Sequence, residues 1–531
     1  MRKRYLAAAA WFLIGLCFCL APVSQAQASR AQTAEENAAK YMESVGHQPG
    51  LLLAFLQQMP KGGDLHVHLS GAVYAESMID WASENALCVD RSTSKLVHAA
   101  CDSCEPYRVK PSVRCAYQDH VLYDQLVDAW SMRNWHPAEE SGHDHFFATF
   151  EKFGAALDNH TGDALAEVAS RAAADHVQYV ETMNTTDGEL PDELQVKYLP
   201  KKVGWDAESE LKSDDDFRRL REKLVPGMAE IVAAVRKQVD SDETREREVM
   251  HCGTVQAAAG CGVTIRYLYQ VGRGRPIEQV FAQILLGFEL TKADPRFVGF
   301  NLVMPEDYYV PMHDFDLHMR MIEALRKLYP ATHVSLHAGE LTMGLVPPEG
   351  LRFHIRESIE RAGAERIGHG VDIMNESDPI GLLREMAAKN VLVEICLTSN
   401  DVILAVSGER HPLPVYMKYG VPVALATDDE GVSRSDMTHE YLRAVETYGL
   451  AYGELKRMAR ASLEHSFIPG ASLWKDGGSD SRGLRRAAAC AEDEASGDRL
   501  SGKCEKWIGA SERARVQWQL ERAFAEFEKK F

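Results

Sequence analysis

Four short stretches of the sequence carry residue types that bind a divalent metal ion. His66 and His68 are separated by one residue, so their imidazoles point to the same side if this stretch is a β-strand. Two further histidines, His337 and His369, and one aspartate, Asp428, lie in or directly after apolar runs. Imidazole nitrogens and a carboxylate oxygen suit zinc, and three histidines with one aspartate leave room for a water molecule. The sequence therefore predicts a zinc site assembled from distant segments.

The same stretches belong to apolar runs that are typical of parallel strands. Eight runs rich in Val, Ile, Leu and Tyr alternate with segments of helical periodicity, which is the pattern of repeated βα units. Eight such units close into a (β/α)8 TIM barrel, and active-site residues of such barrels lie at the carboxyl ends of the strands. The predicted strands span residues 64–69, 177–183, 264–271, 298–303, 333–340, 366–373, 391–398 and 421–428. The first two connections are much longer than one helix requires, so this α/β barrel carries long insertions after strands 1 and 2.

A carboxylic acid closely follows one of the candidate metal ligands. Glu340 lies three residues beyond His337, near enough to act as a general acid if a dry site raises its pKa and keeps it protonated. Zinc lowers the pKa of a bound water from about 16 to about 7, and His369 or Asp428 could take the proton that this water releases. The fourth strand, 298–303, has no lysine that could bridge a second metal ion. Each signal is weak alone, but their joint occurrence at strand ends favours one hydrolytic metal site.

Four sequence motifs contain these residues. They are residues 59–69 (MPKGGDLHVHL), 335–340 (SLHAGE), 366–370 (RIGHG) and 426–429 (ATDD). As a set they resemble the adenosine deaminase family, in particular its secreted growth-factor-like branch, and the resemblance covers roughly residues 50 to 465. It implies a barrel with one zinc ion per chain that hydrolyses adenosine to inosine and ammonia.

The resemblance also implies a role for each residue of the motifs. It implies zinc binding by His66, His68, His337 and Asp428, protonation of the purine ring by Glu340, activation or orientation of the water by His369, and purine binding by Asp429. Attack at the purine C6 gives a tetrahedral centre only if the adjacent ring nitrogen takes a proton, which is the task expected of Glu340.

The sequence departs from the family pattern at two substrate-binding positions. The family usually has an acidic residue two places beyond the second histidine, where this chain has Ser70. The family typically has glycine after the fourth strand, where this chain has Met304 followed by Pro305, which lacks a backbone donor. We expect Asp429, Ser70, Met304 and Gly339 to contact the substrate. The reaction class is better defined by the sequence than the identity of the purine.

The composition excludes several other classes of protein. The 531 residues are 45% hydrophobic and 26% charged, which is ordinary for a folded domain and argues against disorder. The formal net charge of −19 repels polyanions, so we expect no nucleic-acid partner. The predicted partner is a small molecule, a purine nucleoside.

The N-terminal residues have the order of a secretory signal peptide. Three basic residues at 2–4 precede an apolar run and then small residues that end at Ala26 or Ala28. We predict a signal peptide at 1–28 and a periplasmic or secreted protein without a stable membrane anchor. A retained anchor is the alternative, because the apolar run is barely long enough to span a bilayer.

Export favours disulfide bonds over metal thiolates. Of the nine cysteines that follow the signal peptide, Cys252 with Cys261 and Cys490 with Cys504 are expected local pairs. Sequence leaves open three pairings within one cluster, and a zinc or redox role for its two central members; the cluster comprises Cys88, Cys101, Cys104 and Cys115. We interpret the remaining Cys396 as a small buried hydrophobe.

The rest of the chain is assigned to one barrel domain and one extension. The deaminase barrel is predicted at 29–465, with an inserted cysteine-containing segment at 70–176, and a helical extension packed on the barrel at 466–531. The aromatic stretch at 130–153 could line the mouth of a pocket or a homodimer contact, although packing of an inserted helix is the simpler interpretation. The charged stretch at 201–248 is expected to be a solvated helical face.

These observations favour an exported zinc-dependent deaminase of adenosine and 2′-deoxyadenosine, in purine nucleoside catabolism or salvage. Ser70 keeps open a deaminase of adenine or of another aminopurine nucleoside. A secreted binding or signalling protein on the same barrel is a third hypothesis, but a pure binder needs neither Glu340 nor His369. A zinc hydrolase of amides or esters is the fourth, and the HAGE sequence at 337–340 favours ring protonation instead.

Overall fold

The computed structural model describes residues 33–105, 108–186, 190, 211, 213–475, 485–497 and 499–531. Its centre is an eight-stranded parallel sheet in the order β1-β4-β5-β6-β7-β8-β9-β10, which confirms the predicted barrel. The strands are β1 (Gly62–His68), β4 (Val177–Asn184), β5 (Thr264–Gly272), β6 (Phe297–Val303), β7 (His333–Ala338), β8 (Arg366–His369), β9 (Leu392–Ile395) and β10 (Val423–Leu425). The predicted signal peptide at 1–28 lies outside the described residues.

The first and last strands close the barrel at its carboxyl end. Val67 in β1 forms a parallel bridge with Asp428, three residues beyond the end of β10. The His68 N–H donates to the Asp428 carbonyl (3.1 Å), and the Asp428 N–H donates to the His66 carbonyl (2.8 Å). Closure of the barrel therefore brings three of the predicted metal ligands together.

Three strands are shorter than the sequence predicts, and for two of them the reason lies in a site residue. The third, β9, ends because helix α16 (Leu397–Leu404) begins within the predicted run. The predicted runs at 366–373, 391–398 and 421–428 end as strands at 369, 395 and 425. His369 and Asp428 have left-handed backbones, with φ of +68° and +61°, which a regular strand cannot contain. Such conformations cost of order 1–3 kcal/mol and cluster at functional sites.

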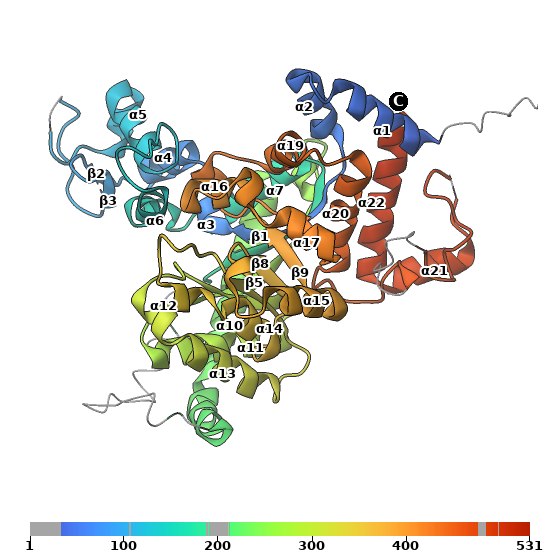
Figure 1. The fold of residues 1–531 in the computed structure, drawn as a ribbon. Coiled ribbons are helices and arrows are strands. Elements are labelled where there is room, and N and C mark those ends of the chain that lie inside the picture. The colour runs from blue at the N-terminus through green and yellow to red at the C-terminus, as the bar shows by residue number, and fades with distance from the viewer. Residues whose placement is uncertain are drawn as a thin grey trace, which may run out of the picture.

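Helices surround the barrel, as Figure 1 shows. They include α7 (Thr161–Ala174), α11 (Ile277–Ala293), α13 (Phe315–Arg326), α14 (His354–Glu360), α15 (Pro379–Lys389), α17 (Leu413–Tyr419), α19 (Met437–Tyr448) and α20 (Tyr452–Glu464). The longest is α10 (Asp214–Val249), whose buried residues recur at helical spacing, from Phe217 through Leu224 and Ile231 to Val239. The opposite face of α10 is largely exposed and charged, which agrees with the solvated face predicted over the described part of 201–248.

The insertion after β1 forms a separate lobe at one end of the barrel (Figure 1). It contains α3 (Leu69–Ala72), α4 (Ala75–Glu84), the antiparallel pair β2 (Cys88–Asp90) and β3 (Lys95–Val97), α5 (His120–Ala129) and α6 (Gly142–Phe153). Disulfides join Cys88 to Cys101 and Cys104 to Cys115. This resolves the pairing that the sequence leaves open and excludes a shared zinc or redox role for Cys101 and Cys104.

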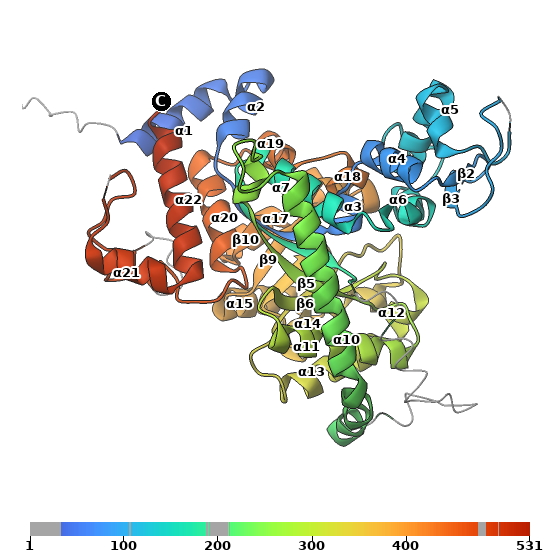
Figure 2. The ribbon, with the colours of Figure 1, turned by 180° about the vertical axis from the view of Figure 1, so that it is seen from behind.

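The two ends of the described chain lie side by side on the barrel. Figures 1 and 2 show α1 (Ala34–Val45) against α22 (Glu512–Glu528), with α2 (Pro49–Gln58) and α20 adjacent. The Lys456 ammonium on α20 pairs with Glu35 on α1 (2.8 Å) and with Glu528 on α22 (2.5 Å). Phe55 packs edge-on against Phe527, with ring centroids 5.0 Å apart.

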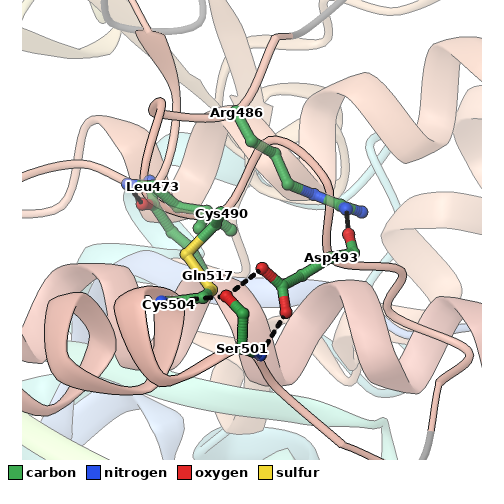
Figure 3. The surroundings of a disulfide bond; sticks show 7 residues. All are labelled: Leu473, Arg486, Cys490, Asp493, Ser501, Cys504 and Gln517. Carbon is green, nitrogen blue, oxygen red and sulfur yellow. Dashed lines mark hydrogen bonds between the residues drawn. A yellow bond between two sulfur atoms is a disulfide. The ribbon is translucent and has the colours of Figure 1, made fainter.

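A second disulfide-bonded lobe precedes α22. Cys490 and Cys504 at the start of α21 (Gly502–Ala510) are joined as predicted, and both are fully buried. Figure 3 shows Asp493 beside this disulfide, where it accepts hydrogen bonds from the Ser501 N–H (2.6 Å) and Oγ (2.8 Å). The Cys490–Cys504 disulfide therefore links two segments that are also joined by the hydrogen bonds between Asp493 and Ser501.

The other cysteines behave as the sequence predicts. Cys252 and Cys261 form the expected disulfide, and Cys396 is free and fully buried. Within the part of the chain that the structure describes, no helix combines the length and apolar character needed to cross a membrane.

Candidate active site

The four predicted metal ligands converge at the carboxyl end of the barrel. The His337 Nε2 lies 3.0 Å from the His66 Nε2 and 3.1 Å from the His68 Nε2. The Asp428 Oδ1 lies 3.4 Å from each of the Nε2 atoms of His66 and His68. These residues come from β1, β7 and the segment after β10, so the strand ends bring them together as the barrel geometry predicts.

The separations of these atoms fit one metal ion. Zinc binds histidine nitrogen and carboxylate oxygen at about 2.0–2.2 Å, and two such bonds at roughly tetrahedral to right angles place the ligand atoms about 3–3.5 Å apart. Four separations among these three nitrogens and one oxygen, those of His337 and Asp428 from His66 and His68, have that value. The donor set therefore suits zinc.

The second nitrogen of each ligating imidazole is held by an oxygen. The Nδ1 of His66 lies 2.6 Å from the Glu394 carboxylate, and the Nδ1 of His337 lies 2.9 Å from the Asn301 side-chain oxygen. The Nδ1 of His68 lies 3.3 Å from the Gln270 side-chain oxygen. An Nδ1–H that donates to an oxygen leaves the Nε2 lone pair free, which is the tautomer that a metal ligand needs.

The carboxylates around the three candidate ligand histidines favour one positive charge among the imidazoles. Burial lowers the pKa of His68 to about 4 and the pKa of His337 well below its usual value, so both are neutral. Burial also acts to lower the pKa of His66, but hydrogen bonds and charges from Asp428 and Glu394 raise it to about 10. A divalent cation on the Nε2 atoms would supply this charge in place of a proton.

Glu394 is itself held by a buried ion network beneath the site. Its second oxygen accepts a hydrogen bond from the Ser335 Oγ (3.0 Å) and lies 2.6 Å from the Arg366 Nε. Arg366 also pairs with Glu181 (2.6 Å), and its guanidinium lies 3.8 Å from the centroid of the Phe467 ring. Every charged member is fully buried, so Glu394 is fixed as a hydrogen-bond acceptor for His66.

Glu340 has the surroundings of a protonated carboxylic acid. It is buried, lies in the same pocket as the histidines, and its Oε1 has no hydrogen-bond partner. Burial, together with the charges of Asp428 and Glu306, raises the pKa of Glu340 well above its usual value. A neutral carboxyl here can donate a proton to a bound molecule, as the sequence predicts for this residue.

Asp429 has similar surroundings close to His68 and Asp428. Burial and the neighbouring charge of Asp428 raise its pKa well above the usual value, and its buried Oδ1 is without a partner. A Cβ at Gly71 would stand 1.6 Å from that oxygen. Glycine at position 71 therefore leaves the space in which the Asp429 carboxyl lies.

His369 lies close to the predicted ligands, although the sequence does not predict it to be one of them. One potential ligand atom of each of His66, His337, His369 and Asp428 lies within 4.8 Å of the others. The Nδ1 of His369 is 3.0 Å from the Asn400 amide nitrogen and 3.8 Å from the Glu340 Oε1. His369 can thus contact a molecule held between the metal ligands and Glu340.

A cavity of about 270 Å³ opens above these groups. The barrel contributes the metal-site residues, Gln270 and the segment 303–305, and the first insertion contributes Ser70 and α6. On α6 the lining residues are Phe146, Phe147, Phe150 and Glu151. The aromatic stretch therefore does line the pocket mouth, and Phe146 and Phe153 also pack in the core as the simpler interpretation requires.

The predicted substrate-binding residues do not all reach this cavity. Ser70, Met304 and Asp429 line it, whereas Gly339 is not among its lining residues and donates its N–H to Glu306 (3.2 Å). Met304 has φ of +83°, in the left-handed region that favours glycine. Position 304 thus keeps a glycine-like backbone while carrying a side chain that narrows the pocket.

Several supporting residues were not predicted from the sequence. Asn301 and Glu394 are single polar residues inside fully buried strands, and that contrast is the signal that could have identified them, because buried polar groups need partners. Glu306 accepts the backbone N–H groups of Gly339 (3.2 Å) and Glu340 (2.9 Å). The phenyl rings of α6 carried no comparable signal, because aromatic residues at helical spacing are typical of any core helix.

Comparison with known proteins gives one family. Residues 230–473 match the sequence model of the family described as "Adenosine deaminase". The adenosine deaminase of Clostridium perfringens strain ATCC 13124 is 35% identical over 135 residues, which cover 25% of this chain and 37% of that protein. The enzyme of Shewanella loihica is 37% identical over 113 residues, which cover 21% and 33%. The chain thus spans about a third of the length of the curated relatives it matches.

Solved structures of lower identity are also similar to this chain. The Arabidopsis protein ADAL complexed with IMP has a TM-score of 0.49 and 18% identity, covering 89% of this chain and 99% of that chain. Adenine deaminase from Arthrobacter aurescens has a TM-score of 0.47 and 17% identity, covering 77% and 94%.

Proposed function

Since the chain belongs to the adenosine deaminase family, we propose that it is a zinc-dependent hydrolase that removes the 6-amino group of adenosine and 2′-deoxyadenosine. The products are ammonia and, from adenosine, inosine. The observation that carries this proposal is a buried Glu340, whose pKa is raised well above its usual value, in the same pocket as three of the converging metal-ligand candidates, His68, His337 and Asp428.

The residues of the pocket divide the reaction between them. Zinc on His66, His68, His337 and Asp428 would lower the pKa of water towards 7 and so supply a nucleophile at neutral pH. The water oxygen attacks C6 of the purine while Glu340 gives its proton to the adjacent ring nitrogen. The first proton of the water passes to Asp428 or His369 and from there to the 6-amino nitrogen, the C6–N6 bond breaks, and ammonia leaves. The remaining proton on the C6 oxygen returns to Glu340 as the C6 carbonyl forms.

Asp429 is suited to orient the purine. Burial and the charge of Asp428 raise the pKa of this carboxyl well above its usual value, and a protonated carboxyl can donate a hydrogen bond to an acceptor nitrogen on the ring edge next to C6. Gly71 leaves the room that this carboxyl occupies. The phenyl rings of α6 close the apolar side of the cavity and can pack on the face of the base.

The charge of the cavity favours a nucleoside over a nucleotide. No lysine or arginine occurs among the described residues that line it, whereas Glu151, Glu340, Asp428 and Asp429 do. A phosphate group would find no cation to pair with and would face carboxylates. Ser70 and Glu151 are the polar groups at the pocket that can hydrogen-bond the hydroxyls of a sugar.

The proposal includes export to the periplasm or the medium. Four disulfides connect eight cysteines of the described chain, and disulfides persist in oxidising compartments. Nucleosides outside the cytoplasm would then be the substrates.

An ultraviolet assay on the purified protein tests the proposal, with metal content measured on the same sample. Adenosine and 2′-deoxyadenosine should be converted, AMP should not, and activity should be lost on chelation and restored by zinc. Turnover of adenine alone would replace the nucleoside with the base as substrate. Metal binding without conversion of any of the four compounds would contradict the proposed activity.

A matched pair of variants separates metal binding from chemistry. Glu340→Gln keeps the shape of the side chain but removes its proton, so zinc should stay bound while turnover falls by at least about 100-fold. His337→Ala removes a metal ligand, so both zinc and turnover should be lost. Near-normal turnover of Glu340→Gln would show that Glu340 is not the proton donor.

A further inference from the structure

A chain of three hydrogen bonds leads from the backbone of α17 to His369. It runs from Leu413 through His411 and Asn400. The side chains of Asn400, His411 and His369 are all buried. None of these bonds involves a predicted metal ligand, and no role was predicted for Asn400 or His411.

The hydrogen bond farthest from His369 determines which atom donates and which accepts in each of the three bonds. The Leu413 N–H lies 3.1 Å from the His411 Nδ1, and a backbone amide can only donate, so this Nδ1 is an acceptor without a proton. Burial lowers the pKa of His411 to about 4, so the ring is neutral and carries its single proton on Nε2.

That proton fixes the orientation of the Asn400 amide. The His411 Nε2 lies 3.1 Å from the Asn400 Oδ1, which accepts its hydrogen bond. The Asn400 Nδ2 then faces the His369 Nδ1 at 3.0 Å. An amide NH2 group can only donate, so the His369 Nδ1 must accept, and neutral His369 carries its proton on Nε2.

The Nε2 of His369 is the nitrogen left for a ligand. It is buried and has no hydrogen-bond partner in the structure, and His369 lines the cavity together with Glu340 and Asp428. Its ring centroid is 4.9 Å from that of His66 and 5.3 Å from that of His337. A neutral Nε2–H at this place can donate a hydrogen bond but cannot accept a proton.

We infer that Asn400 and His411 are positioning residues that hold the His369 ring with its Nδ1 as a hydrogen-bond acceptor. This arrangement leaves the Nε2 of His369 as the nitrogen that can contact a molecule bound in the cavity. The inference rests on the proposed deamination and adds two residues that orient His369 for it.

The tautomer can be measured without turnover. Protein labelled with 13C and 15N in its histidines is studied by solid-state NMR, and His369 is identified as the signal absent from His369→Gln. The expected result is a neutral ring protonated at Nε2, before and after zinc is added. A proton on Nδ1 of His369 in the wild-type protein would overturn the inference, whatever the substrate is.

A substitution that reverses the hydrogen bond between Asn400 and His369 tests what the tautomer of His369 contributes to turnover. In Asn400→Asp a carboxylate faces Nδ1, so His369 should move its proton to Nδ1 and lose its Nε2–H donor. Turnover of the aminopurine should fall by about 100-fold or more, with zinc content unchanged. An unchanged His369 spectrum together with near-normal turnover would contradict the inference.

The conservative and disruptive changes at His411 provide the control for a merely structural effect. His411→Gln retains an N–H donor towards the Asn400 Oδ1, whereas His411→Leu removes it. His411→Gln should therefore keep the Nε2–H form of His369 and lose less turnover than His411→Leu. Equal loss in both, with the His369 spectrum unchanged in both, would assign His411 to packing alone.

Failure of the proposed function is recognised separately, because wild-type protein would then convert none of the aminopurines while its NMR spectrum still reports the tautomer.

Discussion

At the scale of single residues, Glu306 influences the proposed proton donor from behind the pocket. Its buried carboxylate accepts the N–H groups of Gly339 (3.2 Å) and Glu340 (2.9 Å) and a hydrogen bond from the His354 Nδ1. Burial acts to raise the pKa of Glu306, but His354, Arg273 and these donors lower it to about 2. Glu306 is therefore negative at any working pH and helps to keep Glu340 protonated.

Glu306→Gln should move the alkaline limb of the pH profile to lower pH. The active form has Glu340 protonated, so activity is present below the pKa of Glu340 and is lost as the pH rises through it. Removal of the nearby negative charge lowers that pKa, and the dependence of kcat/KM on pH reports the change. Glu376→Gln is the matched control, because Glu376 is also buried but accepts the N–H groups of Ile355 and Arg356 at the start of α14. An alkaline limb at the wild-type pH in Glu306→Gln would contradict this role.

The convergence of the candidate metal ligands could be predicted from the sequence, and the residues that orient them could not. His66, His68 and His337 follow from spacing and from their place at strand ends, which a barrel brings together. Asn301 and Glu394 lie in two other strands of the barrel, β6 and β9, but a polar residue in a buried run has a partner that only the tertiary fold reveals. The same limit applies to hydrogen-bond direction, because the tautomer of His369 depends on atoms that lie far from it in the sequence.

At the scale of elements, α6 reaches the pocket because its first residue has no side chain. A Cβ at Gly142 would stand 1.7 Å from the Val402 carbonyl on α16 (Leu397–Leu404), so only glycine allows this approach. Ser141 begins the helix by accepting the Asp144 N–H (3.0 Å). Contact between α6 and α16 thereby places three phenyl rings over the cavity.

Gly142→Ala should weaken substrate binding more than it slows the chemistry. The added methyl group must displace α6 from α16, and the phenyl rings then move with the helix. We expect KM for adenosine to rise roughly tenfold with kcat little changed, the pattern of lost uniform binding. Gly154→Ala is the control, because nothing lies within 4 Å of a Cβ at the other end of α6. Steady-state kinetics of both variants give the two KM values. Equal KM values would exclude a role for the contact between α6 and α16 in substrate binding.

The strands were predictable as elements, whereas the packing of the first insertion was not. Apolar runs define all eight strands to within a few residues, because a parallel sheet covered on both faces needs continuous hydrophobic sequence. In the first insertion, the position of α6 depends on Gly142 meeting a carbonyl some 260 residues away in the chain. A local pattern does not contain such a contact, and for that reason the sequence left a pocket wall and a packed helix as alternatives.

At the scale of the whole molecule, the proposed metal lies on the seam of the barrel. The backbones of β1 and of the segment after β10 pair through the bridge between Val67 and Asp428 and the two hydrogen bonds around it. The Asp64 carboxylate in β1 also accepts hydrogen bonds from the Thr427 N–H and Oγ1. His66 and His68 stand on one side of this seam and Asp428 on the other. By contrast, the four disulfides close short loops outside the barrel strands, with separations of 9 to 14 residues.

Metal removal and disulfide reduction should therefore loosen different parts of the protein. A ligand that binds only the folded state stabilises it, so chelation should lower the unfolding temperature and speed amide hydrogen exchange at β1 and around Asp428 more than at β5 and β6, which pair along most of their length. Reduction should instead speed exchange within residues 88–115 and 490–504 and leave the seam protected. Hydrogen exchange followed by mass spectrometry measures both treatments on the same peptides. Uniformly faster amide exchange around the barrel on chelation would show that the metal does not close the seam. If added zinc restores the slow exchange of β1 and of the Asp428 segment, barrel closure depends on the same ion that the proposed chemistry needs.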